Sequence, residues 1–466
     1  MIRLQKSDPR VSKPKRILVD MSHTAYSGFN TGIQRVVRKL ASTLPSVAQR
    51  EGIECFPVVC HDGQFYRYDG KEPRFAIPDL TTLKTTFHSR LPKPYVRAVD
   101  QICRGPAMKG LRKQLAPNEG HLGAFNIPLR CWLKTSRVFV ARPIEFSTGD
   151  CLVLPEGYWG IMHIWDAARK AKSQGAMLHS VIYDLICMTH PQYFGPGASE
   201  SFENFLNAVL NDVDLVTAIS QTVRDQIRER APKYVPEHKR PEIGSFRLGA
   251  EITHKPGPVR GEVSRIFRDP ADTPYLMVST FEPRKNHKIV LDAFEKLWRQ
   301  GSRRSLLMIG RVGWMCEENL RRVAELQSCG FPLHVFHDLS DCEVDYSYAH
   351  SRGVIYPSFV EGFGLPIVEA LWHGRPTIAS DTAIHREVGR DDCLYFHPDN
   401  ADELISRVEQ VEHRYASGLV ACACVQPTGW EQSCEDLFDS LLTTYAEVRG
   451  RSRRQHTAAS LASAAA

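Results

Sequence analysis

Short apolar runs alternate with amphipathic segments along much of the chain, and in the second half this alternation is regular. The runs expected to be strands are 275–279, 305–309, 333–336, 353–356 and 376–379, and the segments expected to be helices are 287–299, 317–328, 341–350 and 366–373. Residues 287–299 place their large apolar side chains at the spacing of a helix with one face on a sheet. Repeated βα units imply right-handed crossovers, so we predict a parallel sheet with ligand sites at the carboxyl ends of its strands.

The first half shows a less regular version of the same pattern. Apolar runs predict strands at 16–20, 56–60, 151–154, 177–184 and 214–220, and the segment after the first strand has the apolar periodicity of a helix. Proline-rich polar sequence at 231–241 and at 255–274 marks the expected hinge region. A chain of 466 residues is too long for a single core, which favours two domains of roughly 200 residues each.

The composition limits the class of protein and its compartment. Apolar residues make up 42% of the chain, which is ample for two cores, and the thirteen cysteines follow neither a secreted disulfide spacing nor a paired CxxC pattern. Reduced thiols are therefore expected. The first sixteen residues lack the apolar stretch of a signal peptide, and no run of about 18 apolar residues could span a bilayer. We therefore expect a cytoplasmic protein.

Two glutamates bracket a glycine-rich turn in the segment EGFGLPIVEALWHG. Glu361 lies in the loop and Glu369 lies eight residues later, early in the following helix. Gly362 and Gly364 let the backbone pass close to a ligand, and the free amides at the helix start favour phosphate oxygens. Carboxylates can accept hydrogen bonds from sugar hydroxyls, so the segment suits a sugar joined to a phosphate. The alternative is an ordinary strand, turn and helix with both glutamates solvated.

The sequence around this turn resembles a known family. YPSFVEGFGLPIVEALWHGRPTIAS (356–380) closely resembles the donor-site segment of retaining glycosyltransferases of family 4, which have the GT-B fold. VIYDLICMTHPQYF (181–194) resembles a subset of these enzymes that act in bacterial surface-polysaccharide assembly. Further similar segments are STFEPRKNH (279–287), LLMIGRVGW (306–314), SDTAIHREVG (380–389) and NTGIQRVVRKL (30–40). The resemblance covers most of residues 16–412.

The resemblance implies an α/β fold of the GT-B type. Two Rossmann-like domains with parallel sheets would face each other across a cleft, and a C-terminal helix would cross back to the first domain. The segments expected on this basis are a basic N-terminal tail at 1–15, an acceptor-side domain at 16–250, a nucleotide-sugar-binding domain at 251–427, a crossover helix at 428–448 and a disordered tail at 449–466.

The resemblance also implies roles for the donor-site residues. Arg284 and Lys285 would neutralise the charge of the leaving diphosphate, although a basic pair in a loop is otherwise often only solvated. Glu361 and Glu369 would orient the donor sugar and its nucleotide. The backbone amides expected to support the phosphates belong to Gly32, Ile33, Gly362, Phe363, Gly364 and Leu365. The chain has no Asp-x-Asp placed as a metal site and the family generally needs none, so we expect neither a metal nor a cofactor.

A catalytic group from the first domain is also expected by resemblance. Many relatives carry a histidine or an aspartate after a central strand, and close relatives often show His-Asp where this chain has Tyr183-Asp184, followed by His190. Asp184 is our first candidate and His190 the second. The alternative is that Asp184 only caps its loop. Retention of the anomeric configuration is inherited from the family and is shown by no residue here.

One basic segment departs from the family pattern. Residues 82–142 carry twelve Lys and Arg against two acidic residues, interleaved with five aromatic residues. Such a surface suits anionic lipid and the diphosphate of a polyprenyl-linked acceptor, and it would place the protein peripherally on the inner face of the cell membrane. Nucleic acid is not expected as a partner, because no nucleic-acid-binding motif accompanies the charge. The alternative is a solvated insertion whose charge serves solubility.

These observations predict a glycosyltransferase. It would move a sugar from a nucleotide-sugar donor, with GDP-mannose as the leading choice, to a polyprenyl-diphosphate-linked glycan in O-antigen, capsule or exopolysaccharide biosynthesis. Two alternatives remain, a noncatalytic GT-B subunit that binds sugar nucleotide or glycan, and a nucleotide-sugar epimerase. The complete set of Arg284, Lys285, Glu361 and Glu369 favours the transferase over the noncatalytic subunit. The basic segment counts against the epimerase, which needs no lipid acceptor.

Overall fold

The computed structural model describes residues 13–27, 31–69, 143–251, 257–269, 272–418 and 427–465. The basic segment expected at 82–142 and most of the expected N-terminal tail lie outside these residues. The chain divides into two compact units, residues 56–145 and the remainder. The domain boundaries expected at 250 and 427 therefore stay a prediction.

The larger unit contains two parallel β-sheets, and the first is built from the N-terminal half of the chain. Its strands lie side by side in the order β1 (Arg16–Asp20), β4 (Asp150–Leu154), β5 (Met177–Ile182), β6 (Leu215–Ala218) and β7 (Glu242–Ser245). The helices that the described residues form in this half are α1 (Ser22–Tyr26), α2 (Gly32–Arg50), α7 (Met162–Ser173), α8 (Ile186–Thr189), α9 (Ala198–Asp212) and α10 (Gln221–Arg230). Strands β4 and β5 are buried along their whole length, as expected for a parallel sheet covered on both faces.

The smaller unit carries an antiparallel hairpin. Strand β2 (Glu54–His61) pairs with β3 (Gln64–Arg67), and Cys60 lies opposite Phe65 in the register. The strand predicted at 56–60 is therefore part of β2. Its antiparallel partner was not predicted.

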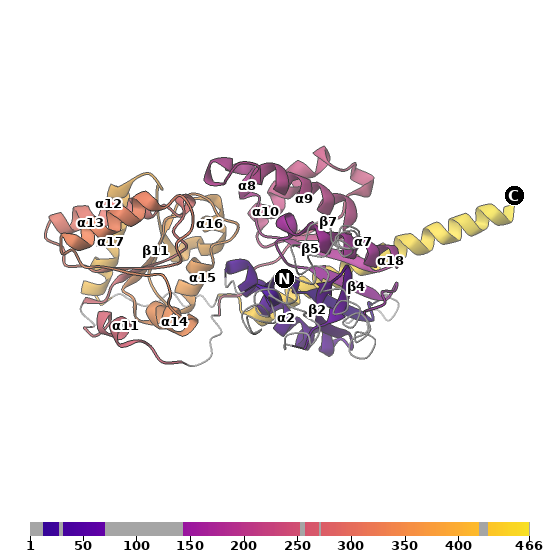
Figure 1. Ribbon diagram of the computed structural model, residues 1–466, viewed down its shortest axis with the longest axis horizontal. Helices are drawn as coiled ribbons and strands as arrows, with labels where there is room; N and C mark the ends of the chain where they lie inside the picture. Colours follow the sequence, from indigo (N-terminus) through magenta and orange to yellow (C-terminus); the bar gives the residue numbers. More distant parts are fainter. Residues whose placement is uncertain are drawn as a thin grey trace, which may run out of the picture. The chain divides into compact units, whose positions relative to one another are not determined.

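The second sheet is built from the C-terminal half and has six parallel strands in the order β10-β9-β8-β11-β12-β13. The strands are β8 (Tyr275–Val278), β9 (Leu306–Ile309), β10 (Leu333–Phe336), β11 (Gly353–Tyr356), β12 (Thr377–Ser380) and β13 (Cys393–Phe396). The helices are α11 (Gly261–Ile266), α12 (His287–Arg299), α13 (Glu317–Ser328), α14 (Asp341–His350), α15 (Leu365–Trp372), α16 (Ala383–Gly389) and α17 (Ala401–Ala416). Figure 1 shows α12, α13 and α17 on one side of this sheet and α11 and α14 on the other.

Alternate residues of the second sheet pack against opposite helix layers. Met277 of β8 belongs to a core cluster with Phe294 of α12, whereas its neighbour Leu276 belongs to a cluster with Tyr348 of α14 and Ala370 of α15. This alternation follows from the two-residue period of a strand. The sheet is therefore covered on both faces, and its loops at the carboxyl edge are left to form a site.

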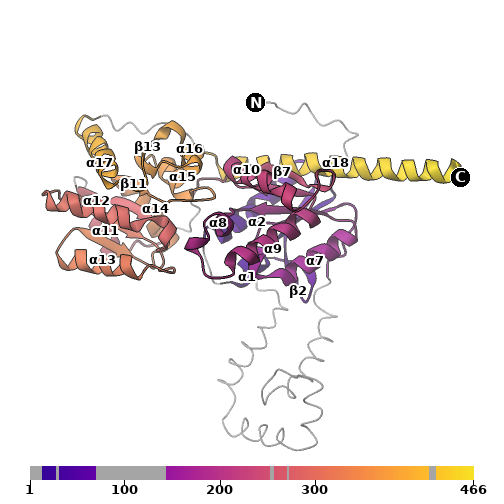
Figure 2. The same ribbon diagram turned by 90° about the horizontal axis from the view of Figure 1, so that it is seen from above.

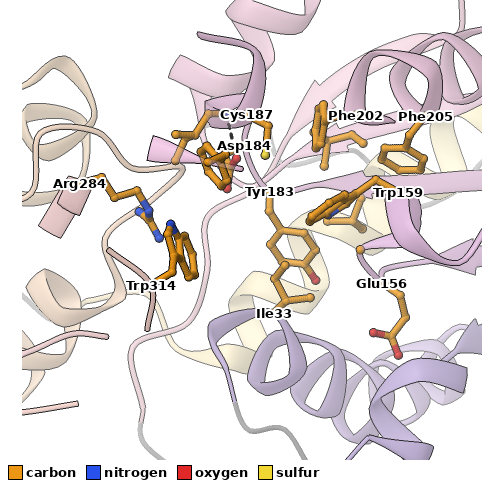
Figure 3. Close-up of a pocket in the computed structure, with 15 residues that line it drawn as sticks. Ile33, Glu156, Trp159, Tyr183, Asp184, Cys187, Phe202, Phe205, Arg284 and Trp314 are labelled. Atoms are coloured by element: carbon orange, nitrogen blue, oxygen red, sulfur yellow. Dashed lines mark hydrogen bonds between the residues drawn. The ribbon is translucent and has the colours of Figure 1, made fainter. Parts of the chain in front are cut away.

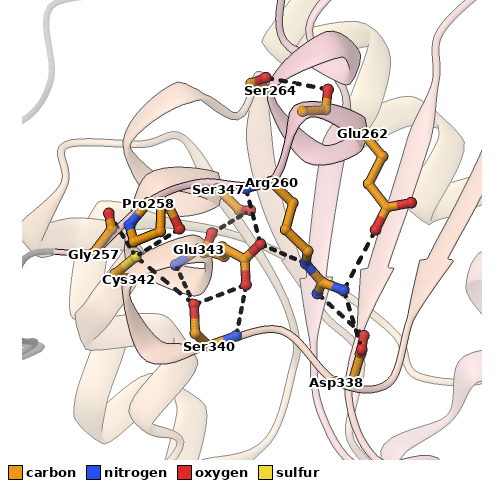
Figure 4. Close-up of polar contacts among 11 residues, drawn as sticks. Gly257, Pro258, Arg260, Glu262, Ser264, Asp338, Ser340, Cys342, Glu343 and Ser347 are labelled. Carbon is orange, nitrogen blue, oxygen red and sulfur yellow. Dashed lines mark hydrogen bonds and ion pairs between the residues drawn. The ribbon is translucent and has the colours of Figure 1, made fainter.

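A polar network fastens the start of the C-terminal half to its sheet (Figure 4). Arg260 donates from Nε to Glu343 at 2.7 Å and from both terminal nitrogens to Asp338 at 3.1 Å. Ser340 and Glu343 form a capping box at the N-terminus of α14. Burial opposes ionisation of Glu343, but Arg260 and the capping hydrogen bonds outweigh it and lower its pKa to about 2. The network ties α14 and the preceding loop to the segment that enters the second sheet.

The final helix, α18 (Trp430–Ala465), returns to the N-terminal half, as predicted. Arg50 of α2 pairs with Glu431 and, at 2.6 Å, with Glu435, and Tyr445 donates to the carbonyl of Thr148 at 2.7 Å. We expected the helix to end at 448 and the tail to be disordered, whereas α18 continues to Ala465 (Figure 2). Its Ala- and Arg-rich end has high helix propensity, which explains the difference. Among the described helices, none combines the length and apolar content needed to cross a membrane.

Candidate functional site

The loops after β8 and β11 bring Arg284, Lys285 and Glu361 together at the carboxyl edge of the second sheet. Arg284 and Lys285 lie on the 3₁₀ turn η8 (Pro283–Lys285), and Glu361 lies in the loop between β11 and α15. Lys285 Nζ is 2.6 Å from Glu361 Oε1, and Arg284 Nη1 is 2.7 Å from Glu361 Oε2. Each carboxylate oxygen therefore accepts from a different cation.

Further contacts hold the two cations in place. Arg284 Nη2 lies 2.6 Å from Glu282 Oε1, and the Arg284 carbonyl accepts from the Phe359 amide at 2.9 Å. Lys285 Nζ donates to the hydroxyl of Tyr356 at 3.2 Å. Sequence reasoning gave no role to Glu282 or Tyr356. Both lie inside segments that carried the family resemblance, and that position was the available signal.

Burial and charge shift the pKa values of this cluster. Burial and the neighbouring Arg284 charge lower the pKa of Lys285. Burial alone would raise the pKa of Glu361, but Arg284 and Lys285 hold it below its usual value. Burial raises the pKa of Glu282 against the opposing charge of Arg284. The two cations are therefore held in fixed positions by the carboxylates that surround them.

The glycine-rich turn leads into α15 as predicted. Gly364 has φ 104°, a backbone conformation that side chains disfavour. Gly362 approaches the N-terminal half so closely that an added Cβ would lie 2.0 Å from the carbonyl oxygen of Tyr183. The first turn of α15 begins at Leu365, which lies near Gly32 of α2. The amides predicted to support phosphates are therefore gathered at two helix N-termini.

Glu369 is buried and is paired with a residue that sequence reasoning did not single out. Arg35 Nη2 lies 2.5 Å from Glu369 Oε1, and the Glu369 side chain is 2% exposed. Arg35 lies one helical turn into α2, inside the NTGIQRVVRKL segment. A nucleotide that bonds to Glu369 must therefore share this carboxylate with Arg35 or displace it.

Asp184 and His190 lie in different surroundings. Asp184 follows β5 and accepts from the Ile186 amide at 2.9 Å; burial raises its pKa, and Arg284 opposes this shift. His190 contacts Thr189 Oγ1 at 2.9 Å and stacks on Tyr193. Asp184 lines the pocket described next, whereas His190 does not.

A pocket with an empty volume of about 680 Å³, including its open mouth, lies beside Arg284 and Asp184. Figure 3 draws Arg284 and Trp314 on one side and Trp159, Phe202 and Phe205 on the other, with Tyr183 between them. The remaining lining residues include Ile33 at the start of α2 and Glu156 after β4. A lining of aromatic side chains with a few polar groups is typical of small-ligand sites.

Two buried carboxyl groups lie at the ends of β1 and β4 and were not predicted as part of the site. Asp20 accepts from the Tyr158 hydroxyl at 2.6 Å, and Glu156 accepts from the Thr24 amide at 2.7 Å. Burial raises the pKa of Asp20 to about 6, and burial together with the Asp20 charge raises the pKa of Glu156 to about 7. Among the residues that the structure describes, no group of three or more His, Cys, Asp or Glu side chains is arranged to hold a metal ion.

The comparisons with known proteins concern the family and the fold. Residues 265–417 match the family model described as glycosyl transferases group 1. Serotype-specific mannosyltransferase WbdA of Escherichia coli is 23% identical over 438 residues, which cover 92% of this chain and 46% of that protein. O-antigen chain mannosyltransferase B of Escherichia coli is 27% identical over 238 residues, which cover 50% of this chain and 60% of that protein. The chain therefore spans about half the length of these relatives.

A solved structure shares the fold. Residues covering 95% of this chain and 100% of the other align with HepE of Anabaena, crystallised in complex with UDP and glucose, at a TM-score of 0.50 and 13% identity. Together with the two parallel sheets and the returning helix, this likeness confirms the α/β fold of the GT-B type that the sequence predicted.

Proposed function

We propose that this protein transfers a sugar from a nucleotide-sugar donor to a glycan acceptor, because residues 265–417 match the family model of glycosyl transferases group 1. The observation that carries the proposal is the cluster of Arg284, Lys285 and Glu361 beside a glycine-rich turn and the first turn of α15. Cations and free amides suit a diphosphate, and a carboxylate at the same edge suits sugar hydroxyls.

Each member of this cluster has a task in the proposed reaction. Arg284 and Lys285 stabilise the negative charge that develops on the leaving nucleoside diphosphate, a task that a divalent cation performs in other enzymes. Glu361 orients the donor sugar and holds the side chains of Arg284 and Lys285 in position. Glu369 accepts from the ribose hydroxyls once Arg35 gives up part of its contact. Asp184 belongs to the N-terminal half, and the Arg284 charge is close enough to lower its pKa. It is our candidate to face the reacting carbon or the acceptor hydroxyl.

We propose GDP-mannose as the first donor to test, because the relatives named above are mannosyltransferases. The proposed acceptor is a polyprenyl-diphosphate-linked glycan of O-antigen, capsule or exopolysaccharide biosynthesis, met at the inner face of the cell membrane. The name of the second relative, an O-antigen chain mannosyltransferase, supports this class of acceptor. Retention of the anomeric configuration belongs to the same proposal.

Thermal unfolding with candidate donors tests the donor site. GDP-mannose, UDP-glucose, UDP-N-acetylglucosamine, dTDP-rhamnose and their free diphosphates are added to the purified protein, with and without EDTA. We expect one nucleotide family to raise the melting temperature, since a ligand that binds only the folded state stabilises it, and the shift to persist in EDTA. Absence of a shift with every nucleotide would overturn the proposed donor site.

A matched pair of variants assigns the shift to the cluster. Lys285→Met removes the buried ammonium group that contacts Glu361. Lys288→Met removes a neighbouring ammonium group whose side chain is 72% exposed and whose ion-pair partner is Asp292 on the same helix. The nucleotide shift should be lost in the first variant and kept in the second. The opposite pattern would place the nucleotide elsewhere.

A further inference from the structure

The pocket beside Asp184 contains two exposed indole rings. Trp159 is 38% exposed and Trp314 is 42% exposed, and both line the pocket. Trp159 comes from the 3₁₀ turn η3 (Tyr158–Gly160) after β4, and Trp314 comes from the loop after β9. Large aromatic side chains left open to solvent in a concave site commonly contribute binding energy.

Trp159 is exposed but its backbone is firmly held. Its neighbour Tyr158 is fully buried and donates to Asp20 at 2.6 Å. Ser201 Oγ on α9 donates to the Trp159 carbonyl at 3.0 Å. These contacts from either side fix the backbone of the turn that carries the indole, so little backbone entropy is lost when a ligand binds there.

Trp314 is held in a comparable way. Its indole Nε1 donates to the Tyr193 carbonyl at 2.7 Å, and its ring lies 6.1 Å from that of Phe194. The preceding Gly313 passes so close to the backbone that an added Cβ would lie 2.6 Å from the Phe281 carbonyl oxygen. Because the N–H group is already used, the exposed part of this side chain offers chiefly its ring.

The lining of the pocket is amphipathic. Apolar surface comes from Trp159, Trp314 and neighbouring phenylalanines, whereas polar groups come from Glu156, Asp184 and Arg284. A pyranose ring has the matching character, since its C–H face is apolar and its hydroxyl groups lie around the edge. An isoprenoid chain offers no hydrogen-bonding group to the polar side chains of this lining, whereas the hydroxyl groups of a sugar do. These features favour a sugar.

We propose that Trp159 and Trp314 form the subsite for the terminal sugar of the acceptor glycan. The two indoles pack on the C–H faces of the sugar, and Asp184 accepts from one of its hydroxyl groups. Arg284, which belongs to the proposed donor site, lines the same pocket, so a sugar held here lies next to the donor. This inference rests on the proposed function and identifies its acceptor as a saccharide recognised by stacking.

Oligosaccharide binding tests the proposal without requiring turnover. α-Mannotriose, chitobiose and maltotriose are titrated by calorimetry into the wild-type protein and into Trp159→Ala, Trp314→Ala and Trp372→Ala. Trp372 is the matched control, because it is 43% exposed and does not line the pocket. We expect at least one saccharide to bind, with roughly five- to tenfold weaker affinity in each pocket variant and unchanged affinity in the control. Failure of all three to bind would overturn the proposal, as would equal losses in the three variants.

Phenylalanine substitutions distinguish loss of ring stacking from loss of folding. Trp159→Phe and Trp314→Phe keep an aromatic face and should retain most of the affinity, whereas a merely structural role would not distinguish Phe from Ala once both variants show wild-type thermal unfolding. If an alanine variant fails to fold, Trp→Leu at the same position, which keeps apolar volume but no ring, takes its place. Affinity as high in Leu as in Phe would overturn the stacking role.

Turnover separates this inference from the proposed function. In an active enzyme the pocket variants should raise the acceptor KM and leave the donor KM unchanged. Unaltered acceptor KM in an active enzyme would overturn the inference and leave the transferase proposal standing. Tryptophan-dependent saccharide binding by a protein that neither binds nor turns over any nucleotide sugar would support the subsite and overturn the transferase proposal.

Discussion

Replacement of Glu361 by glutamine is expected to destabilise the C-terminal half of the protein. The carboxylate accepts from Lys285 at 2.6 Å and from Arg284 at 2.7 Å, and its side chain is only 8% exposed. Glutamine keeps the volume and one acceptor oxygen but removes the negative charge. Arg284 keeps a second carboxylate, Glu282, at 2.6 Å. Lys285 keeps its hydrogen bond to the neutral Tyr356 hydroxyl at 3.2 Å.

The expected loss of unfolding free energy follows from these contacts. Breaking a buried ion pair by removing one partner costs about 3–5 kcal/mol, and the oxygen that remains on glutamine favours the lower end, about 3 kcal/mol. For a cooperative unit of 150–250 residues this corresponds to a fall of roughly 6–12 °C in melting temperature. Because burial already lowers the pKa of Lys285, the variant can recover part of the cost by releasing the lysine proton.

The dependence on pH provides a second signature. The pKa of Glu361 is depressed in the folded protein, so its stabilising contribution is fully present above the pKa of an unfolded glutamate and is lost as the pH falls below it. The difference in unfolding free energy between wild type and variant should therefore be constant near neutral pH and shrink below a pH of about 4.5.

Urea unfolding followed by tryptophan fluorescence measures both effects. The control is Glu262→Gln, which removes an exposed ion-pair partner of Arg260 at 3.4 Å with a side chain that is 57% exposed. Such surface pairs contribute about 0–1 kcal/mol. If Glu361→Gln cost no more than this control at neutral pH, the buried cluster would not have the energetic role assigned to it.

Three further expectations concern the C-terminal half. Glu343→Gln should lower the unfolding free energy at neutral pH by about 1 kcal/mol, because its partner Arg260 is partly exposed to solvent. The difference should shrink between pH 4.5 and 2, since Arg260 helps to hold the pKa of Glu343 at about 2; urea unfolding at several pH values measures it. Gly310→Ala places a Cβ 1.8 Å from the Ser279 carbonyl oxygen and should sharply lower the melting temperature; an unchanged value would contradict the close approach. Lys285→Met should raise the barrier of the proposed transfer by about 2–4 kcal/mol, measured as kcat, and normal turnover would remove its assigned role.

The strands and helices of the C-terminal half could be predicted because their signal is local. The predicted helix 287–299 is α12 (His287–Arg299), and the predicted helices 317–328 and 341–350 coincide with α13 and α14. Hydrophobic periodicity depends only on which side of a helix or strand meets the core. The end of α18 was missed for the converse reason, since a segment without an apolar face carries no periodicity and its helical state rests on propensity.

Part of the candidate site was also accessible from the sequence. Arg284, Lys285 and Glu361 follow strands of one parallel sheet, so their meeting at its carboxyl edge follows from strand order. The resemblance of the flanking segments supplied the expected fold, which the comparisons bear out, and residues 265–417 match a glycosyltransferase family model. The roles of these residues remain predictions for the experiments above.

Only the tertiary structure decided which distant residues meet. Arg35 and Glu369 are separated by more than three hundred residues and form one ion pair, and Trp159 and Trp314 reach one pocket from the two halves. The structure also separated Asp184, which lines that pocket, from His190, which does not. Such partnerships depend on how helices and loops cross in space, and no local pattern of hydrophobic and polar positions records them.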